Sequence, residues 1–445
     1  MALKLRLLLS TTLISGALGA WAVSCASGGS GQPGGPGSGS GSSSGTGTGS
    51  GGSGTVGGSS SGSGSSSGSS SGTGEADAGI SIGTGSSSGS GTGGSSSSGS
   101  RPDSSSSGGS SGGSSSGGSS GPPDGGHPTG AARYGWTCPT GPFGAPIAAG
   151  ATATKVTGVP PSDTFNNTLN NFTTIEGPVW IGDALYVSEF PGSPNPPPSR
   201  ILKVTSTGQV SVAVADSGSN GLAVDDNGTL FGAVHEDGSI SRFDLSGGVR
   251  VLPSVVSSYM GMRFNSPNDL AVRSDGTVYF SDPNFQAPSP APQTATRVYR
   301  YTPSTSTLSV VDATISQPNG VTLSLDETTL YVSSSNGIQK YAVMPDGSTG
   351  PGSPFAQAPN ATLNIDGMAI DCAGNIYGAV IGTGNIITLS PAGAQVGALV
   401  SVSTAVVTNI AFGGQDHKTL YVTTQGSSGS QGLFTVPGSI PGMPY

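Results

Sequence analysis

The sequence is poor in charge and in the residues that build disulfide frameworks or thiolate metal clusters. Only 9% of its 445 residues are charged, and it contains three cysteines and three histidines. Three cysteines exclude a multi-disulfide scaffold and a thiolate cluster. Three histidines exclude a histidine-rich zinc site unless nearly all of them converge. The net charge of −9 argues against nucleic acid or anionic lipid as a partner.

Hydrophobic residues are also scarce, at 33% of the chain, whereas glycine occupies 78 positions. That balance does not suit one uniformly folded globule of this length. Long helical periodicity is absent throughout. The composition instead predicts a chain of two unlike parts, one without a core and one with an ordinary β-rich core.

Residues 1–25 have the features of an export signal. Lys4 and Arg6 provide the positive start, and the apolar stretch that follows is short for a membrane span. The end of this segment, from Ala22 to Cys25, resembles a bacterial lipobox. Acylation of Cys25 would anchor the exported protein to the cell envelope. The alternative is ordinary cleavage, which would leave a periplasmic or secreted protein with a free thiol.

Residues 26–133 are dominated by Gly and Ser and show no apolar periodicity. Such a segment buries too little apolar surface to offset chain entropy. We expect a long disordered tether here, with residues 134–445 forming the folded domain.

Residues 134–445 contain short alternating apolar runs separated by Gly, Pro, Asn and Asp, which is typical of strands and turns. Six segments within them share one plan: a polar residue, a short strand, a polar turn and a second strand. They begin 43 to 51 residues apart. A repeat of that length holds four short strands, one propeller blade. The sequence therefore predicts an all-β, six-bladed β-propeller.

The residue that opens each repeat carries a side-chain oxygen. The six are Glu176, Asn220, Asn268, Asn319, Asp366 and Asn409. In a propeller, equivalent residues of the innermost strands surround one central channel. Carboxylate and amide oxygens without sulfur suit Ca²⁺, which accepts about six to eight such ligands. The alternative is that Asn and Asp merely begin turns, but Glu176 has no such local reason to stand there.

Several motifs in this order resemble the gluconolactonase family, which includes regucalcin, senescence marker protein and luciferin-regenerating enzyme. The resemblance spans roughly residues 170–430. It rests on EGPVW at Glu176, NSPNDLAV around Asn268, YFSDPNF from Tyr279, QPNGVTLS around Asn319, DGMAID at Asp366 and TNIAFGG at Asn409.

The resemblance implies a six-bladed propeller that binds a divalent metal, usually Ca²⁺ and sometimes Zn²⁺, and opens lactones. It implies that the metal ligands are Glu176, Asn268, Asn319 and Asp366, with Asp366 also the general base. Asn220 and Asn409 rest on register alone, and we expect them to bind substrate or to support the ligands. His235 matches a family histidine in part, so it either binds substrate or packs near a turn. His417 lies in the turn QDHKT and is expected to be solvated.

The leading hypothesis is a metal-dependent lactonase, monomeric, acting on a small-molecule lactone and reaching a membrane only through a lipid anchor. One alternative is a non-catalytic, lipid-tethered binding propeller with a structural Ca²⁺. Another is a related esterase that acts on phosphate esters. If Cys25 is acylated, Cys138 and Cys372 remain in an oxidising location, either bridged to each other or free.

Overall fold

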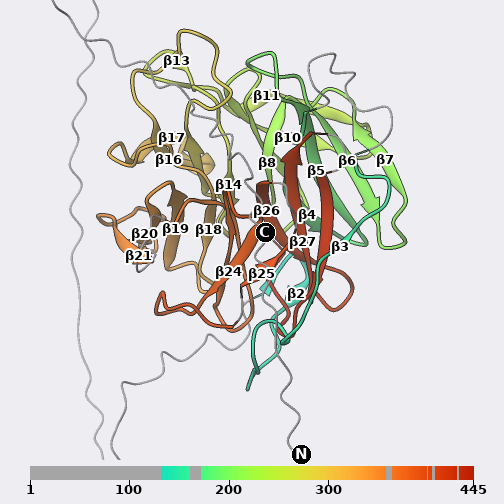
Figure 1. Ribbon diagram of the computed structural model, residues 1–445. Coiled ribbons are helices and arrows are strands. Elements are labelled where there is room, and N and C mark those ends of the chain that lie inside the picture. Colours follow the sequence, from blue (N-terminus) through green and yellow to red (C-terminus); the bar gives the residue numbers. More distant parts are fainter. Residues whose placement is uncertain are drawn as a thin grey trace, which may run out of the picture. The chain divides into compact units, whose positions relative to one another are not determined.

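The structure, a computed structural model, describes residues 132–160, 172–356, 363–397, 399–402, 406–427 and 430–444 (Figure 1). The elements within these ranges are β-strands, apart from one 3₁₀ turn, η1 (Pro303–Thr305). The expected signal peptide, Cys25 and the expected tether up to residue 131 lie outside the described residues. The last two residues assigned to the tether instead form strand β1 (Ala132–Arg133), which pairs with β2 (Trp136–Thr137).

Four antiparallel sheets each contain four strands in chain order. The first two sheets are β8 (Ser219–Val224), β9 (Leu230–Val234), β10 (Ser239–Asp244) and β11 (Val249–Val256); then β14 (Leu270–Val272), β15 (Val278–Asp282), β16 (Arg297–Thr302) and β17 (Thr307–Asp312). The next two are β18 (Val321–Leu323), β19 (Thr329–Ser334), β20 (Gly337–Ala342) and β21 (Ser353–Ala356); then β22 (Ile365–Ile370), β23 (Ile376–Val380), β24 (Asn385–Leu389) and β25 (Val400–Ser401). Between the first and second sheets lies a small hairpin, β12 (Ser258–Tyr259) and β13 (Met262–Arg263).

An eight-stranded sheet contains two further runs of antiparallel neighbours. One run is β4 (Thr173–Ile181), β5 (Ala184–Pro191), β6 (Arg200–Thr205) and β7 (Val210–Val214). The other is β26 (Val406–Gly413), β27 (Thr419–Gly426), β28 (Gly432–Pro437) and the early strand β3 (Thr154–Lys155). The two runs join where β27 pairs with β4. The pairing of β3 with β28 brings the two ends of the domain into one sheet.

The first strands of these runs contact one another in a closed series. β4 contacts β8, β8 contacts β14, β14 contacts β18, β18 contacts β22, β22 contacts β26, and β26 contacts β4. Figure 1 shows β4, β8, β14 and β26 near the middle of the domain and the last strands β7 and β21 at its edge. The arrangement is therefore propeller-like and all-β, as the repeats indicated.

Hydrophobic packing between neighbouring sheets follows from the two-residue period of the strands. Six clusters of buried apolar side chains separate the sheets. One cluster joins Tyr186 and Ile201 to Leu222 and Phe243, from adjacent sheets. Burying such a side chain stabilises the fold by roughly 1.5–3 kcal/mol. These clusters hold the first strands at fixed positions around the centre.

The N-terminal segment of the domain is fastened to the sheet that begins with β22. Cys138 and Cys372 form a disulfide with a Cα–Cα distance of 5.4 Å. Trp136 stacks on His417, with ring centroids 4.0 Å apart. The expectation that His417 is solvated was wrong, because this stacking covers the ring and leaves only 9% of the residue exposed.

Candidate functional site

A cavity of about 220 Å³ lies among the first strands of the sheets. Five of the six oxygen-bearing residues that the sequence singled out line it: Glu176, Asn220, Asn268, Asn319 and Asp366. The sixth repeat contributes Thr408. The structure thus brings together residues that are up to 190 positions apart in the sequence, as the repeat argument predicts for a shared channel.

Asn409 does not line this cavity, and its position shows that the register assigned to the sixth repeat was one residue late. The bulge in β26 falls between Val407 and Ile410, so Thr408 occupies the place that Asp366 has in β22. Asn409 therefore corresponds to the position directly after the oxygen-bearing residue, which is occupied by Gly in four of the other repeats. Its Oδ1 accepts from the Ile410 N–H at 2.8 Å, and its side chain hydrogen-bonds Glu176.

The residue after the oxygen-bearing position packs directly against the next repeat. A Cβ at Gly221 would lie 2.5 Å from Asn268 O, and one at Gly320 would lie 2.3 Å from Asp366 O. Glycine is therefore required where these backbones approach so closely. The third repeat carries Asp269 at this position instead, and its carboxylate accepts a hydrogen bond from the Val321 N–H of the next repeat.

Asp269 is a buried acid that the sequence analysis did not single out. Its Oδ1 accepts from the Leu270 N–H and its Oδ2 from the Val321 N–H, both at 2.9 Å. It thereby links β14 to β18 beneath Asn268 and Asn319. The available signal was its position, because it is the one charged residue where four other repeats have Gly.

Serine hydroxyls on the second strands hydrogen-bond the backbone carbonyls of cavity residues in the next repeat. The Ser281 hydroxyl donates to Asn319 O, and the Ser333 hydroxyl donates to Asp366 O, each at 2.6 Å. In the sixth repeat the Thr408 hydroxyl donates to Ile175 O at 2.7 Å. Each bond runs from one repeat to the next. The small polar residues that end the second strands therefore set the spacing of the site.

Three buried carboxyl groups, those of Glu176, Asp269 and Asp366, lie close enough to influence one another's ionisation. Burial raises the pKa of Glu176 to about 8, and the neighbouring Asp269 adds to this rise. Burial also raises the pKa of Asp269 to about 7. The pKa of Asp366 lies well above its ordinary value, because of burial first and then the charges of Glu176 and Asp269. A bound cation would act in the opposite direction, since positive charge favours the ionised acid.

The donor set fits a hard divalent cation. The Oδ1 atoms of Asn220 and Asn319 are buried and have no hydrogen-bond partner among the described residues. With Glu176 and Asp366 they supply oxygen without nitrogen or sulfur, the ligand type that Ca²⁺ prefers. In the described ranges no three His, Cys, Asp or Glu side chains form a metal cluster by themselves. The amides are therefore needed to complete the site.

His235 lies one layer behind the cavity, so it does not line it. Its Nε2 donates to Pro197 O at 3.0 Å, and its ring packs edge-on against Phe190, which lines the cavity. Arg263 donates to His235 O at 3.0 Å and to Glu236 O at 3.1 Å. Both residues support the wall of the cavity.

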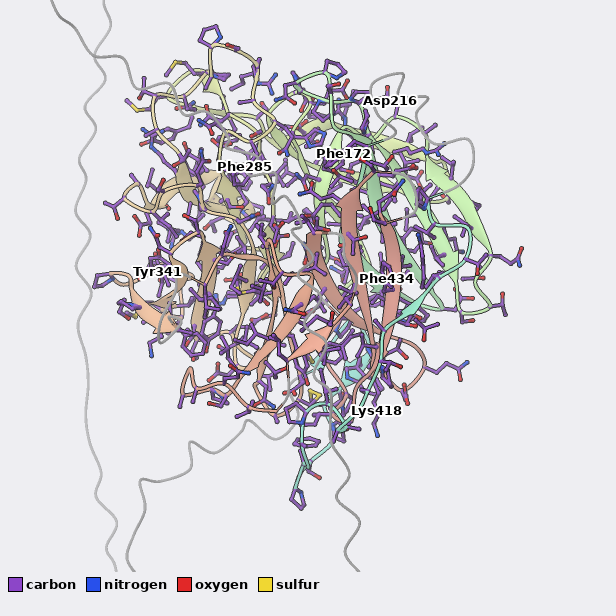
Figure 2. The ribbon with its side chains drawn as sticks, viewed as in Figure 1. Phe172, Asp216, Phe285, Tyr341, Lys418 and Phe434 are labelled. Atoms are coloured by element: carbon purple, nitrogen blue, oxygen red, sulfur yellow. A yellow bond between two sulfur atoms is a disulfide. The ribbon has the colours of Figure 1, made fainter. Side chains whose placement is uncertain are left out.

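Apolar and amide side chains complete the lining. Phe190, Phe285 and Ile381 are the apolar members, and Thr174, Gln286 and Gln425 are the neutral polar ones. Figure 2 shows Phe285 well away from Lys418, which marks the opposite end of the domain. Phe285 and Gln286 come from the long loop between β15 and β16, where no repeat pattern pointed to them.

Comparison with known proteins assigns the chain to a family. Residues 175–426 match the family model described as the SMP-30/Gluconolactonase/LRE-like region. The chain belongs to this family. The matched region runs from β4 to the end of β27 and contains every cavity residue except Thr174. The resemblance seen in the sequence motifs is thereby confirmed.

Three relatives illustrate the similarity. A gluconolactonase of Zymomonas mobilis is 29% identical over 279 residues, covering 56% of this chain and 75% of that protein. A pentonolactonase of Haloferax volcanii is 32% identical over 126 residues, or 28% and 43% of the two chains. The solved structure of a gluconolactonase from Xanthomonas campestris has a TM-score of 0.52 at 26% identity, covering 67% and 98%.

Within the described ranges, no helix is long and apolar enough to cross a membrane.

Proposed function

We propose that this protein is a lactonase of six-bladed propeller fold that depends on a divalent cation, with Ca²⁺ preferred. The observation that carries the proposal is the convergence of Glu176, Asn268, Asn319 and Asp366 on one cavity, with unpaired amide oxygens beside two carboxylates. The names of the relatives, gluconolactonase and pentonolactonase, support the choice of substrate. The closed series of contacts among six first strands supports the blade count.

Hydrolysis adds water to the lactone carbonyl carbon, breaks the ring C–O bond and releases a hydroxy acid and a proton. A cation held by the four ligands would polarise the carbonyl oxygen. In this proposal Asp366 accepts the proton of the attacking water, and the amide of Asn220 orients the lactone. The Ser333 hydroxyl, which donates to Asp366 O, holds that residue at the cavity.

The full chain can be tested by following proton release from aldonolactones and simpler lactones, with Ca²⁺ and then with EDTA. We expect cation-dependent turnover that falls at least about 100-fold in Asp366→Asn, the loss typical of a general acid–base group. Asp225→Asn is the matched control. Asp225 caps an exposed turn through the N–H groups of Asn227 and Thr229, far from the cavity residues in its repeat.

Two outcomes would replace the proposal. Calcium binding without turnover of any lactone would indicate a binding propeller with a structural ion. Turnover of phosphate triesters but of no lactone would indicate an esterase for that class.

We also propose that the protein is exported and held at the bacterial cell envelope by acylation of Cys25, and that the propeller is monomeric. The charge and apolar run before Cys25 and the lipobox-like residues support this. Radiolabelled palmitate should enter the wild-type protein but not Cys25→Ala. Equal labelling of both, or of neither, would refute acylation at this residue.

A further inference from the structure

Apart from Glu176 and Asp366, the residues that line the cavity are uncharged, and three of them are apolar. Phe190, Phe285 and Ile381 line it, together with Gln286 and Gln425. Among the described residues that line the cavity there is neither Lys nor Arg. The segments between residues 161 and 445 that lie outside the description contain no Lys or Arg in their sequence either. A carboxylate or phosphate on the substrate would therefore find no counter-charge there.

The guanidinium of Arg263, which supports this wall from behind, is occupied by backbone carbonyls. Arg263 donates from all three guanidinium nitrogens to the backbone carbonyls of His235, Glu236 and Phe264. His235 in turn packs edge-on against Phe190, with ring centroids 4.8 Å apart. Phe190 is 3% exposed, so its ring is a fixed wall and cannot turn away to admit a polar group.

The two glutamines offer donors and no charge. Gln286 Oε1 accepts from Asn220 Nδ2 at 3.4 Å, and Gln425 Oε1 accepts from the Thr174 hydroxyl at 3.3 Å. With both carbonyl oxygens engaged, each side chain can present its Nε2 to a ligand. Such donors suit a neutral ester or ring oxygen held between apolar surfaces.

Phe285 gives the wall an accessible aromatic face. It is 39% exposed and follows β15 in the loop that also carries Gln286. When a ligand covers an exposed aromatic ring beside a cavity, apolar surface is removed from water, which favours binding. Hydroxyl groups of a sugar lactone would be desolvated against this ring and against Phe190 without a matching set of partners.

We infer that the preferred substrates are neutral lactones with an alkyl or aryl substituent, and that Phe190 and Phe285 select the substituent. This inference rests on the proposed lactonase function. Lactones whose substituent carries a carboxylate or a phosphate are disfavoured, because Phe190 and Phe285 would desolvate the anion and no Lys or Arg lines the cavity to pair with it.

The test compares kcat/KM of the full-length protein, with Ca²⁺ present, on four lactones. They are an unsubstituted δ-lactone, the same ring with a phenyl or pentyl group, glucono-δ-lactone, and a lactone bearing a free carboxylate. We expect the substituted ring to be the best substrate and the carboxylate the worst. In Phe285→Ala the preference for the substituted over the unsubstituted ring should fall by about tenfold, the scale of discrimination in an apolar pocket.

Phe355→Ala is the matched control, because Phe355 is a partly exposed ring on β21 that packs on Tyr331 and does not line the cavity. Its preference should stay at the wild-type ratio. Phe285→Arg gives a second test, since it should raise the relative rate on the carboxylate lactone. Glucono-δ-lactone as the best substrate, with an unchanged ratio in Phe285→Ala, would overturn the inference while leaving the lactonase intact. Failure to open any lactone would instead refute the proposed function.

Discussion

His235 is completely buried, with its Nε2–H donated to Pro197 O and its ring edge against Phe190. The pKa of His235 is lowered to about 3, mainly by burial. The hydrogen bond to Pro197 O raises this pKa, whereas the charge of Arg263 contributes to lowering it. The ring is therefore neutral in the folded protein at any pH above that value. The Nδ1 atom has no hydrogen-bond partner among the described residues, so protonating it would place an unpaired charge in the wall of the cavity.

This depressed pKa predicts a loss of stability in mild acid. Because the unfolded histidine binds a proton near pH 6.5 and the folded one does not, the stability is complete above pH 6.5 and is lost as the pH falls toward about 3. Between pH 7 and pH 5, the free energy of unfolding of the wild type should fall by about 2 kcal/mol more than that of His235→Gln. Urea unfolding at the two pH values measures this, with His127→Gln as the control for removing a histidine. The same pH dependence in wild type and His235→Gln would contradict the prediction.

At the scale of the strands, the spacing of the site depends on the close approach of successive repeats. A Cβ at Gly320 would lie 2.3 Å from Asp366 O, a backbone atom that cannot rotate away. We expect Gly320→Ala to cost about 1–3 kcal/mol in stability and to weaken calcium binding, because it moves the backbone of Asp366. Gly350→Ala is the matched control, since its Cβ would meet nothing closer than Ala342 Cβ at 3.7 Å. Urea unfolding and calcium titration check both variants; a Gly320→Ala protein that binds calcium like Gly350→Ala would refute the argument.

The same repeats explain what the sequence could predict. The opening residues Glu176, Asn220, Asn268, Asn319 and Asp366 recur at one register, and a ring of equivalent strands must bring them to one cavity. The prediction for the sixth repeat was wrong because Thr408 and Asn409 both carry a side-chain oxygen. Only the bulge in β26 decides which of the two faces the cavity. Phe285 and Gln286 lie in an inter-strand loop, whose path depends on packing and follows no period. The Trp136 stack on His417 was also beyond the sequence, because it joins segments about 280 residues apart.

On the scale of the whole domain, closure depends on contacts between the two ends of the chain. β3 pairs with β28, and β27 pairs with β4, so both ends of the domain meet in one sheet. Near the N-terminal end of the domain, the disulfide from Cys138 reaches Cys372, which lies 234 residues further along the chain. Ile147 forms a bridge with Gly438, and Tyr377 donates its hydroxyl to Pro146 O at 3.4 Å. The segment before β3 is thus held by the disulfide and by these backbone and hydroxyl contacts.

Removing the disulfide tests whether it only anchors the N-terminal segment of the domain or also keeps the ring of first strands closed. A crosslink over so long a loop stabilises a fold by about 2–5 kcal/mol, so Cys138→Ala/Cys372→Ala should unfold at lower urea than the wild type. Wild-type protein treated with a reductant is the control for the substitutions themselves. Because β3 still pairs with β28 without the disulfide, we expect faster amide hydrogen exchange in residues 134–147 and unchanged protection in β4, β8 and β14. Exchange that rises equally in those three strands would show instead that the disulfide is needed to hold the ring of strands closed.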